Sequence, residues 1–241
     1  VAVGVAILPR LARAARSDDQ KAGGQLMDDG SGLAMALTVP AAVALIIAPV
    51  FLLNGLYVRG AFTLTDAQQA GLALMHYGWG VPAFVLIKVL APAYFAREDT
   101  KTPMRFALIT VALNTALGAG LFFWLKSIGQ AGFPGLAIAT SIAAWLNAGL
   151  LFFGLRHRGW YAPGKRLVSR LVSVTLASIS MGLALFFILT QQARFEAIIP
   201  YGKAIETVAF ILIGIIIYAI AALLFGAIRL SDLKSALARR A

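Results

Sequence analysis

Long apolar runs, separated by shorter polar segments, set the pattern of the chain. Each run reaches the roughly 20 residues that a helix needs to cross a hydrocarbon core about 30 Å thick. The runs predict membrane-spanning helices near residues 33–53, 71–96, 104–125, 134–155, 168–190 and 204–228. Two longer loops are expected, at 10–32 and 54–70, and the other connections are short enough to make neighbouring helices antiparallel.

The first nine residues are also apolar, but they are too few to span a membrane and lack the basic start of a signal peptide. We interpret them as the end of a helix whose beginning lies upstream. The expected fold is therefore an all-α, polytopic membrane helix bundle of six full transmembrane helices and the end of a seventh. The chain is expected to be the C-terminal portion of a longer protein.

Composition supports a membrane protein. The chain is 60% hydrophobic and 13% charged, with a mean hydropathy of +0.84, whereas a soluble domain is about half apolar and a quarter charged. Cysteine is absent from the sequence, which excludes disulfides and thiolate metal sites within it. The net charge of +11 is interpreted as contact with anionic membrane lipids and as cytoplasmic loops, not as nucleic-acid binding.

Basic residues gather on one side of the predicted helices. Of the 21 lysines and arginines, 16 lie in the segments 10–21, 97–105, 156–170 and 229–240. Four others lie on the opposite side: Arg59, Lys126, Arg194 and Lys203. Because cytoplasmic loops are enriched in lysine and arginine, the rich side should be cytoplasmic, and so should the C-terminus.

Lys88 is the remaining basic residue, and it lies inside an apolar run. It precedes Arg97, where the cytoplasmic interface should begin, by nine residues, or roughly 13 Å of helix. A lysine stem reaches about 6 Å, too short to bring the ammonium group to water from that depth. Exposure to lipid would cost about 3 kcal/mol, so Lys88 should face protein or a water-filled cavity.

Prolines on either side of Lys88 weaken its predicted helix. Pro92 cannot donate to the carbonyl of Lys88, so the helix should bend there and leave an acceptor beside the charge. Pro82 similarly frees the carbonyl of Gly78. All ten acidic residues are expected in loops or at helix ends, away from the depth of Lys88. The partner of Lys88 is then another part of the protein, an anionic substrate, or a set of hydroxyl and carbonyl groups.

A turn of mixed charge, Arg97-Glu98-Asp99, follows this helix. One interpretation is an ordinary capped loop on the cytoplasmic side. The other is a cytoplasmic gate held by salt bridges, which would also involve Arg10 and Arg13 of the first loop. The sequence leaves both open.

Several segments resemble one family of membrane transporters. They are L-P-R-L-A-R at 8–13, Y-V-R-G-A-F at 57–62, K-V-L-A-P-A-Y-F-A-R-E-D-T-K-T-P at 88–103, and G-L-A-I-A-T-S-I-A-A-W-L-N at 135–147. They resemble the MurJ/MviN family of lipid II flippases, within the multidrug/oligosaccharidyl-lipid/polysaccharide exporter superfamily. The resemblance covers nearly the whole chain.

The resemblance implies a bacterial inner-membrane protein of two lobes and an extra C-terminal helix pair. On this mapping, residues 1–155 hold the end of helix 8 to helix 12, and 156–241 hold the C-terminal pair and a cytoplasmic tail. The implied function is movement of the undecaprenyl-pyrophosphate-linked peptidoglycan precursor to the outer leaflet by alternating access. The implied partners are this lipid, membrane lipids and a missing N-terminal lobe.

Residue roles also follow from the resemblance. Lys88 lies in the segment that matches a cavity-lining helix, where it would bind the substrate pyrophosphate. The spans 168–190 and 204–228 would form a groove for the polyprenyl tail, although peripheral packing explains them equally well. Some members bind a cation through positions that Asn114 and Thr140 match. Gly118 stands where a carboxylate is needed, so we interpret Asn114 as a helix–helix hydrogen bond and expect no metal or cofactor.

Two other functions compete with this one. The first is export of another substrate, a drug or an O-antigen lipid, by a member of the same superfamily. The second is a membrane enzyme acting on polyprenyl phosphates, which would need clustered carboxylates to hold magnesium. Asp18-Asp19 and Asp28-Asp29 are the candidate pairs, in a predicted flexible loop without a nearby histidine. We therefore expect a transporter without catalytic residues.

Overall fold

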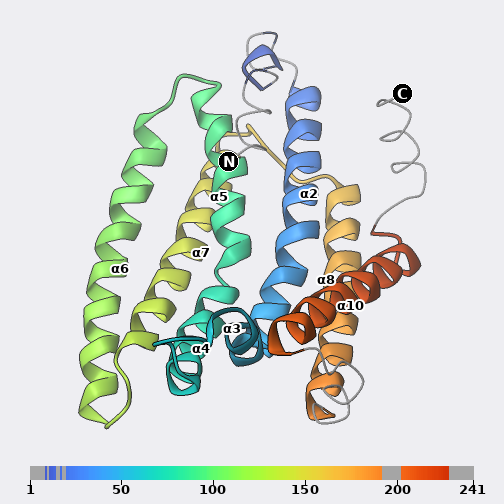
Figure 1. The fold of residues 1–241 in the computed structure, drawn as a ribbon. Coiled ribbons are helices and arrows are strands. Elements are labelled where there is room, and N and C mark those ends of the chain that lie inside the picture. Colours follow the sequence, from blue (N-terminus) through green and yellow to red (C-terminus); the bar gives the residue numbers. More distant parts are fainter. Residues whose placement is uncertain (1–8, 10, 15–16, 18–19, 192–201, 228–241) are drawn as a thin grey trace.

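The computed structural model describes residues 9, 11–14, 17, 20–191 and 202–227. Over these residues the regular elements are helices, gathered in one bundle (Figure 1). Six stretches are long and apolar enough to cross a membrane: 21–47, 64–95, 101–127, 133–157, 165–190 and 203–224. The predicted all-α membrane bundle is confirmed. The helix end predicted before residue 9 and the tail after residue 227 lie outside the described part of the chain.

The first predicted span, 33–53, has the wrong bounds. Helix α2 (Gln20–Ile47) begins well inside the predicted loop 10–32, and a second, shorter helix, α3 (Pro49–Tyr57), follows after a break at Ala48. Proline in the first turn of α3 favours a new helix start at this point. The apolar run therefore continues through two helices that the sequence pattern did not separate.

The polar start of α2 is helical because tertiary partners meet its polar groups. Asp28 accepts hydrogen bonds from the Tyr161 hydroxyl (2.7 Å) and the Gly164 backbone N–H (3.0 Å). Met27 beside it is 1% exposed and belongs to the largest buried cluster. The expectation that Asp28 and Asp29 lie in a flexible loop is therefore wrong.

The second predicted span, 71–96, consists of two helices instead of one bent helix. α4 (Leu64–Gly78) begins inside the predicted loop 54–70, and α5 (Val81–Phe95) follows it after a short break. Pro82 stands in the first turn of α5, directly after this break, where a proline favours the start of a helix. Pro92 lies inside α5, as predicted.

The other four spans lie close to their predicted bounds. They are α6 (Lys101–Ser127), α7 (Phe133–His157), α8 (Lys165–Thr190) and α10 (Lys203–Leu224). α6 lies at one edge of the bundle and packs on α7, while α10 crosses obliquely at the other edge and packs on α8 and α3 (Figure 1). α8 also packs on α2. The predicted division of the chain at residue 155 stays a prediction.

Helix α7 holds the break between α4 and α5. The Ser141 hydroxyl donates to the His76 carbonyl (2.7 Å), and the Trp145 indole N–H donates to the Trp79 carbonyl (2.9 Å). These bonds satisfy carbonyl groups that the interrupted helix leaves without partners. A Cβ on Gly80 would overlap the Ser141 hydroxyl oxygen, so glycine is required for the two segments to come this close.

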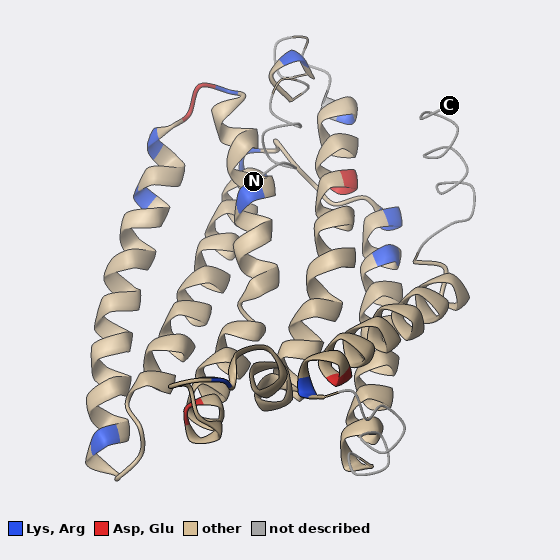
Figure 2. Cartoon of the chain, in the orientation of Figure 1, with Lys and Arg blue, Asp and Glu red and all other residues tan. Residues whose placement is uncertain are grey.

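Charge is distributed unevenly along the long axis of the bundle. Figure 2 shows most lysines and arginines at the end where α5 joins α6 and α7 joins α8, and fewer at the opposite end. This agrees with the two sides predicted from the sequence. Together with the six spans, it describes a multi-pass membrane protein.

Candidate functional site

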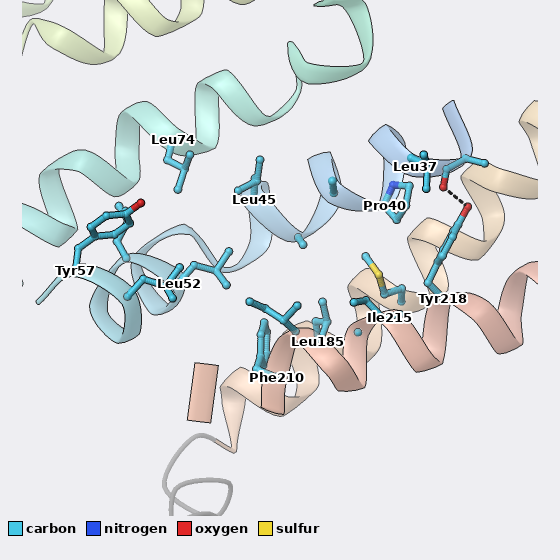
Figure 3. Close-up of a pocket in the computed structure, with 18 residues that line it drawn as sticks. Leu37, Pro40, Leu45, Leu52, Tyr57, Leu74, Leu185, Phe210, Ile215 and Tyr218 are labelled. Atoms are coloured by element: carbon cyan, nitrogen blue, oxygen red, sulfur yellow. Dashed lines mark hydrogen bonds between the residues drawn. The ribbon is translucent and has the colours of Figure 1, made fainter. Parts of the chain in front are cut away.

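An apolar groove of about 770 Å³ lies between helices α2, α3, α4, α8 and α10, which line it (Figure 3). Its lining among the described residues consists of alanine, leucine, isoleucine, methionine, phenylalanine, proline, glycine and tyrosine, without a charged side chain. Leu37, Pro40, Leu45, Leu52, Leu185 and Phe210 are drawn in Figure 3. The family resemblance implies a groove formed by α8 and α10. In the structure, α2, α3 and α4 line the groove as well.

The break between α2 and α3 shapes this groove. α3 brings Leu52 and Tyr57 to the groove wall. It also contacts α10, where the rings of Phe51 and Phe210 lie 4.8 Å apart between centroids. A Cβ on Gly55 would overlap the Thr207 hydroxyl, so glycine allows the close approach of α3 to α10. Pro49 and Gly55 are the residues in the sequence that indicate a separate helix here and its close approach to α10.

The groove is suited to a hydrocarbon chain. Burial of apolar surface contributes about 25 cal/mol per Å², and a long chain offers many methylene groups to bury. The polar atom of Tyr218 is already used, because its hydroxyl donates to the Ala36 carbonyl at 2.7 Å. The lining therefore favours binding of a long hydrocarbon chain and offers few polar groups that could select a particular head group.

Lys88 lies on α5, away from this groove. Its side chain is exposed, and no described residue gives it a hydrogen bond or ion pair. The sequence predicts that a protein group or a wet cavity meets the ammonium group of Lys88. No described residue supplies such a partner. Binding of pyrophosphate by Lys88 stays a prediction.

The charged turn after α5 is joined to the connection between α7 and α8. Asp99 pairs with Arg158 at 2.5 Å and accepts a hydrogen bond from the Thr102 backbone N–H at 3.0 Å. The hydrogen bonds from Thr102, followed by Arg158, lower the pKa of the Asp99 carboxyl to about 2. Glu98 beside it adopts a positive φ of 60°, and its side chain is exposed.

Arg97 also faces this connection. Its guanidinium lies 5.0 Å from the ring centroid of Trp160, and that of Arg158 lies 4.8 Å from the same ring. Both distances fit cation–π contacts. Arg13 forms no described bond to Glu98 or Asp99, and Arg10 lies outside the described residues. The cytoplasmic gate stays a prediction, and the sequence analysis missed Arg158 and Trp160.

Asn114 forms the predicted contact between helices. The Thr140 hydroxyl of α7 donates to its side-chain oxygen on α6 at 3.3 Å, which confirms the interpretation of Asn114 as a helix–helix hydrogen bond. Gly118 lies near Leu136 and Ala139 of α7 and supplies no oxygen side chain.

Comparison with known proteins identifies one family. The family model described as "Lipid II flippase MurJ" matches residues 1–201. A probable lipid II flippase MurJ of Rhizobium tropici is 36% identical over 245 residues, covering 100% of this chain and 44% of the relative. That of Vibrio cholerae is 35% identical over 236 residues, covering 98% of this chain and 44% of the relative.

A third relative, the lipid II flippase MurJ of Burkholderia cenocepacia, is 37% identical over 163 residues, covering 68% of this chain and 30% of the relative. Among solved structures, lipid II flippase MurJ in an inward closed conformation matches the fold with a TM-score of 0.72 and 24% identity. That match covers 93% of this chain and 42% of the other. The chain spans less than half the length of these relatives.

Proposed function

Because the chain belongs to the lipid II flippase MurJ family, we propose that it supplies the second lobe and the C-terminal helix pair of a membrane flippase. Its substrate is the peptidoglycan precursor linked to a polyprenyl pyrophosphate, which is moved to the outer leaflet by alternating access. The relatives are longer than this chain, and on this proposal the additional length holds a first lobe that completes the transport path. On this proposal the protein lies in the bacterial inner membrane with its C-terminus in the cytoplasm.

The apolar groove is the observation that carries this proposal. Its volume of about 770 Å³ and its uncharged lining fit part of a polyprenyl chain, and it is open to the surface along exposed Leu37. A groove of this kind holds the tail while the head group crosses the membrane elsewhere. The exposed position of Lys88 supports a separate site for the pyrophosphate, at a surface of α5 that the described residues leave without an anionic partner.

Transport is favoured over polyprenyl-phosphate enzymology. Both oxygens of Asp28 accept hydrogen bonds from Tyr161 and Gly164, so this carboxylate is engaged in holding α2 to the α7–α8 connection. Among the described residues, no third carboxylate or histidine joins Asp28 and Asp29 in a group that could hold a metal ion. Their arrangement gives little support to a magnesium site.

Reconstitution tests the proposed function. The full-length protein is placed in lipid vesicles, the polyprenyl-pyrophosphate-linked precursor is loaded in one leaflet, and its appearance in the other is measured. We expect movement well above that in protein-free vesicles. Equal rates in both preparations would refute the flippase, whereas preferential movement of a drug or an O-antigen lipid would select another exporter of the superfamily.

A further inference from the structure

A second cavity lies where α2, the start of α8 and the end of α10 meet. Its volume is about 450 Å³, and unlike the groove it has a strongly polar lining. The side chains that matter here are Asp28, Asp29, Leu33, Arg166, Ser169 and Arg170. Helices α2 and α8 begin at the end of the bundle that carries most of the basic residues (Figure 2).

Arginine dominates the chemistry of this cavity. The Nε of Arg170 is buried and has no hydrogen-bond partner among the described residues. The guanidinium groups of Arg166 and Arg170 form no described ion pair. A guanidinium carries five N–H donors and no acceptor, and a buried donor without a partner is costly. An anion in the cavity would accept from the buried Arg170 donor and lie beside the exposed guanidinium of Arg166.

Arg166 and Arg170 lie close together on α8, and packing against α2 holds Arg170. They are four residues apart on α8 and therefore lie on the same face of the helix. Arg170 lies against α2: a Cβ on Gly32 would come within 3.0 Å of its Nη1 and 3.3 Å of its Cδ. α8 also has no acidic residue in its first turn, where a helix favours negative charge.

The carboxylates of the cavity form no described ion pair with its arginines. Both oxygens of Asp28 already accept hydrogen bonds, from the Tyr161 hydroxyl and the Gly164 N–H. Burial, followed by the hydrogen bond to Asp28, raises the pKa of Tyr161, so its hydroxyl remains a donor. Asp29 is exposed and forms no described bond to either arginine.

The polar cavity and the apolar groove follow one another along α2. Leu33 lines the first and Leu37, one helical turn later, lines the second. Both side chains are exposed, Leu33 by 45% and Leu37 by 65%. A molecule with a phosphate at one end and a hydrocarbon chain at the other matches this order of surfaces.

We propose that Arg166, Ser169 and Arg170 bind the phosphate of a membrane lipid whose hydrocarbon chain runs past Leu33 and Leu37 toward the groove. Arginine recognises phosphate through paired N–H donors, and basic pockets between membrane helices on the cytoplasmic side favour lipid phosphates. A phospholipid and a polyprenyl pyrophosphate share this chemistry. The site is separate from Lys88 and does not require that the protein transports the lipid.

Lipid binding to the full-length protein tests this site. Native mass spectrometry of the detergent-solubilised protein, titrated with phosphatidylglycerol, gives the affinity for each bound lipid. The variant Arg166→Gln/Arg170→Gln should bind at least about tenfold more weakly, because it loses charge-assisted hydrogen bonds to phosphate. Arg105→Gln is the matched control, since it removes an exposed arginine of the first turns of α6, and it should bind like the unchanged protein.

Competition then identifies the source of the phosphate. A short-chain prenyl pyrophosphate that displaces phosphatidylglycerol from the unchanged protein, but not from the double variant, supports a site for both lipids. If inorganic phosphate displaces phosphatidylglycerol and the prenyl pyrophosphate does not, the lipid proposal is overturned. Gly32→Leu, which pushes Arg170 away without removing charge, should weaken binding as well. Equal binding by the unchanged protein, the double variant and Gly32→Leu would also overturn it, and none of these measurements depends on flipping.

Discussion

Asp99 and Arg158 form an ion pair that ties the α5–α6 connection to the α7–α8 connection, across 59 positions of sequence. Around it, Arg97 and Arg158 both contact the ring of Trp160. The charged turn that follows Lys88 is thus part of a cluster within this half of the protein. Any gate that uses Glu98 or Asp99 has to open against these contacts or move together with the α7–α8 connection.

Removal of the Asp99 carboxylate should alter the acid dependence of stability. The pKa of Asp99 is lowered to about 2, below the value near 3.9 of an unfolded chain, so its stabilisation is present above about pH 4 and is lost as pH falls toward 2. Asp99→Asn should lower Tm at pH 7 by about 2–4 °C for each kcal/mol lost, and an exposed pair contributes at most about 1 kcal/mol. Thermal unfolding at pH 7 and pH 3 measures both effects, with Glu98→Gln as control. Equal Tm values for Asp99→Asn and the control would contradict the prediction.

Lys88→Ala in the full-length protein should reduce flipping of the precursor by roughly 10- to 100-fold, the loss expected for one hydrogen bond between a charged donor and phosphate. Lys88→Arg keeps the charge and should retain part of the activity. Thermal stability should not change, because no described residue pairs with Lys88. The control is Lys101→Ala, which removes an exposed lysine at the start of α6. Normal flipping by Lys88→Ala at normal expression would exclude the pyrophosphate contact.

Filling the apolar groove should weaken binding of long prenyl chains. Gly214 lines the groove, and a Cβ there would meet Leu185 at ordinary contact distances of 3.4–3.9 Å. Gly214→Leu should therefore fold while displacing about two methylene groups of the chain, at about 0.8 kcal/mol each, or roughly tenfold in affinity. Binding is compared between long and short prenyl phosphates, and only the long one should be affected. Gly149→Leu, at a helical position with nothing within 4 Å, is the control. An equal loss for both chain lengths would argue against the groove.

A side chain at Gly80 should destabilise the protein. Its Cβ would overlap the Ser141 hydroxyl, and overpacking of this kind costs about 1–3 kcal/mol. Gly80→Ala should lower Tm in detergent, and the double variant with Ser141→Gly should recover part of the loss. Gly120→Ala, at an open helical position, should leave Tm unchanged or raise it. If Gly80→Ala has the same Tm as the unchanged protein, α7 does not hold the break between α4 and α5 as described.

Hydrophobic length and charge were sufficient to predict the spans α6, α7, α8 and α10. Each of these helices is bounded by turns of polar or charged residues, and each crosses without a strong breaker in its middle. The motif from Lys88 to Pro103 predicted the family, because its residues are consecutive and the resemblance can be seen without knowing the fold. Asn114 was predicted correctly as well, since an amide in an apolar helix needs a polar partner and a neighbouring helix is where it finds one.

The apolar runs and the asymmetry of basic residues are properties of the sequence alone, because transfer from water to lipid depends on each residue and hardly on its neighbours. The tertiary structure decided the rest. α2 starts at Gln20 because Tyr161 and Gly164 meet Asp28, and the break at Gly80 is held by Ser141. The groove and the arginine cavity likewise join residues far apart in sequence, and only packed helices bring such residues together.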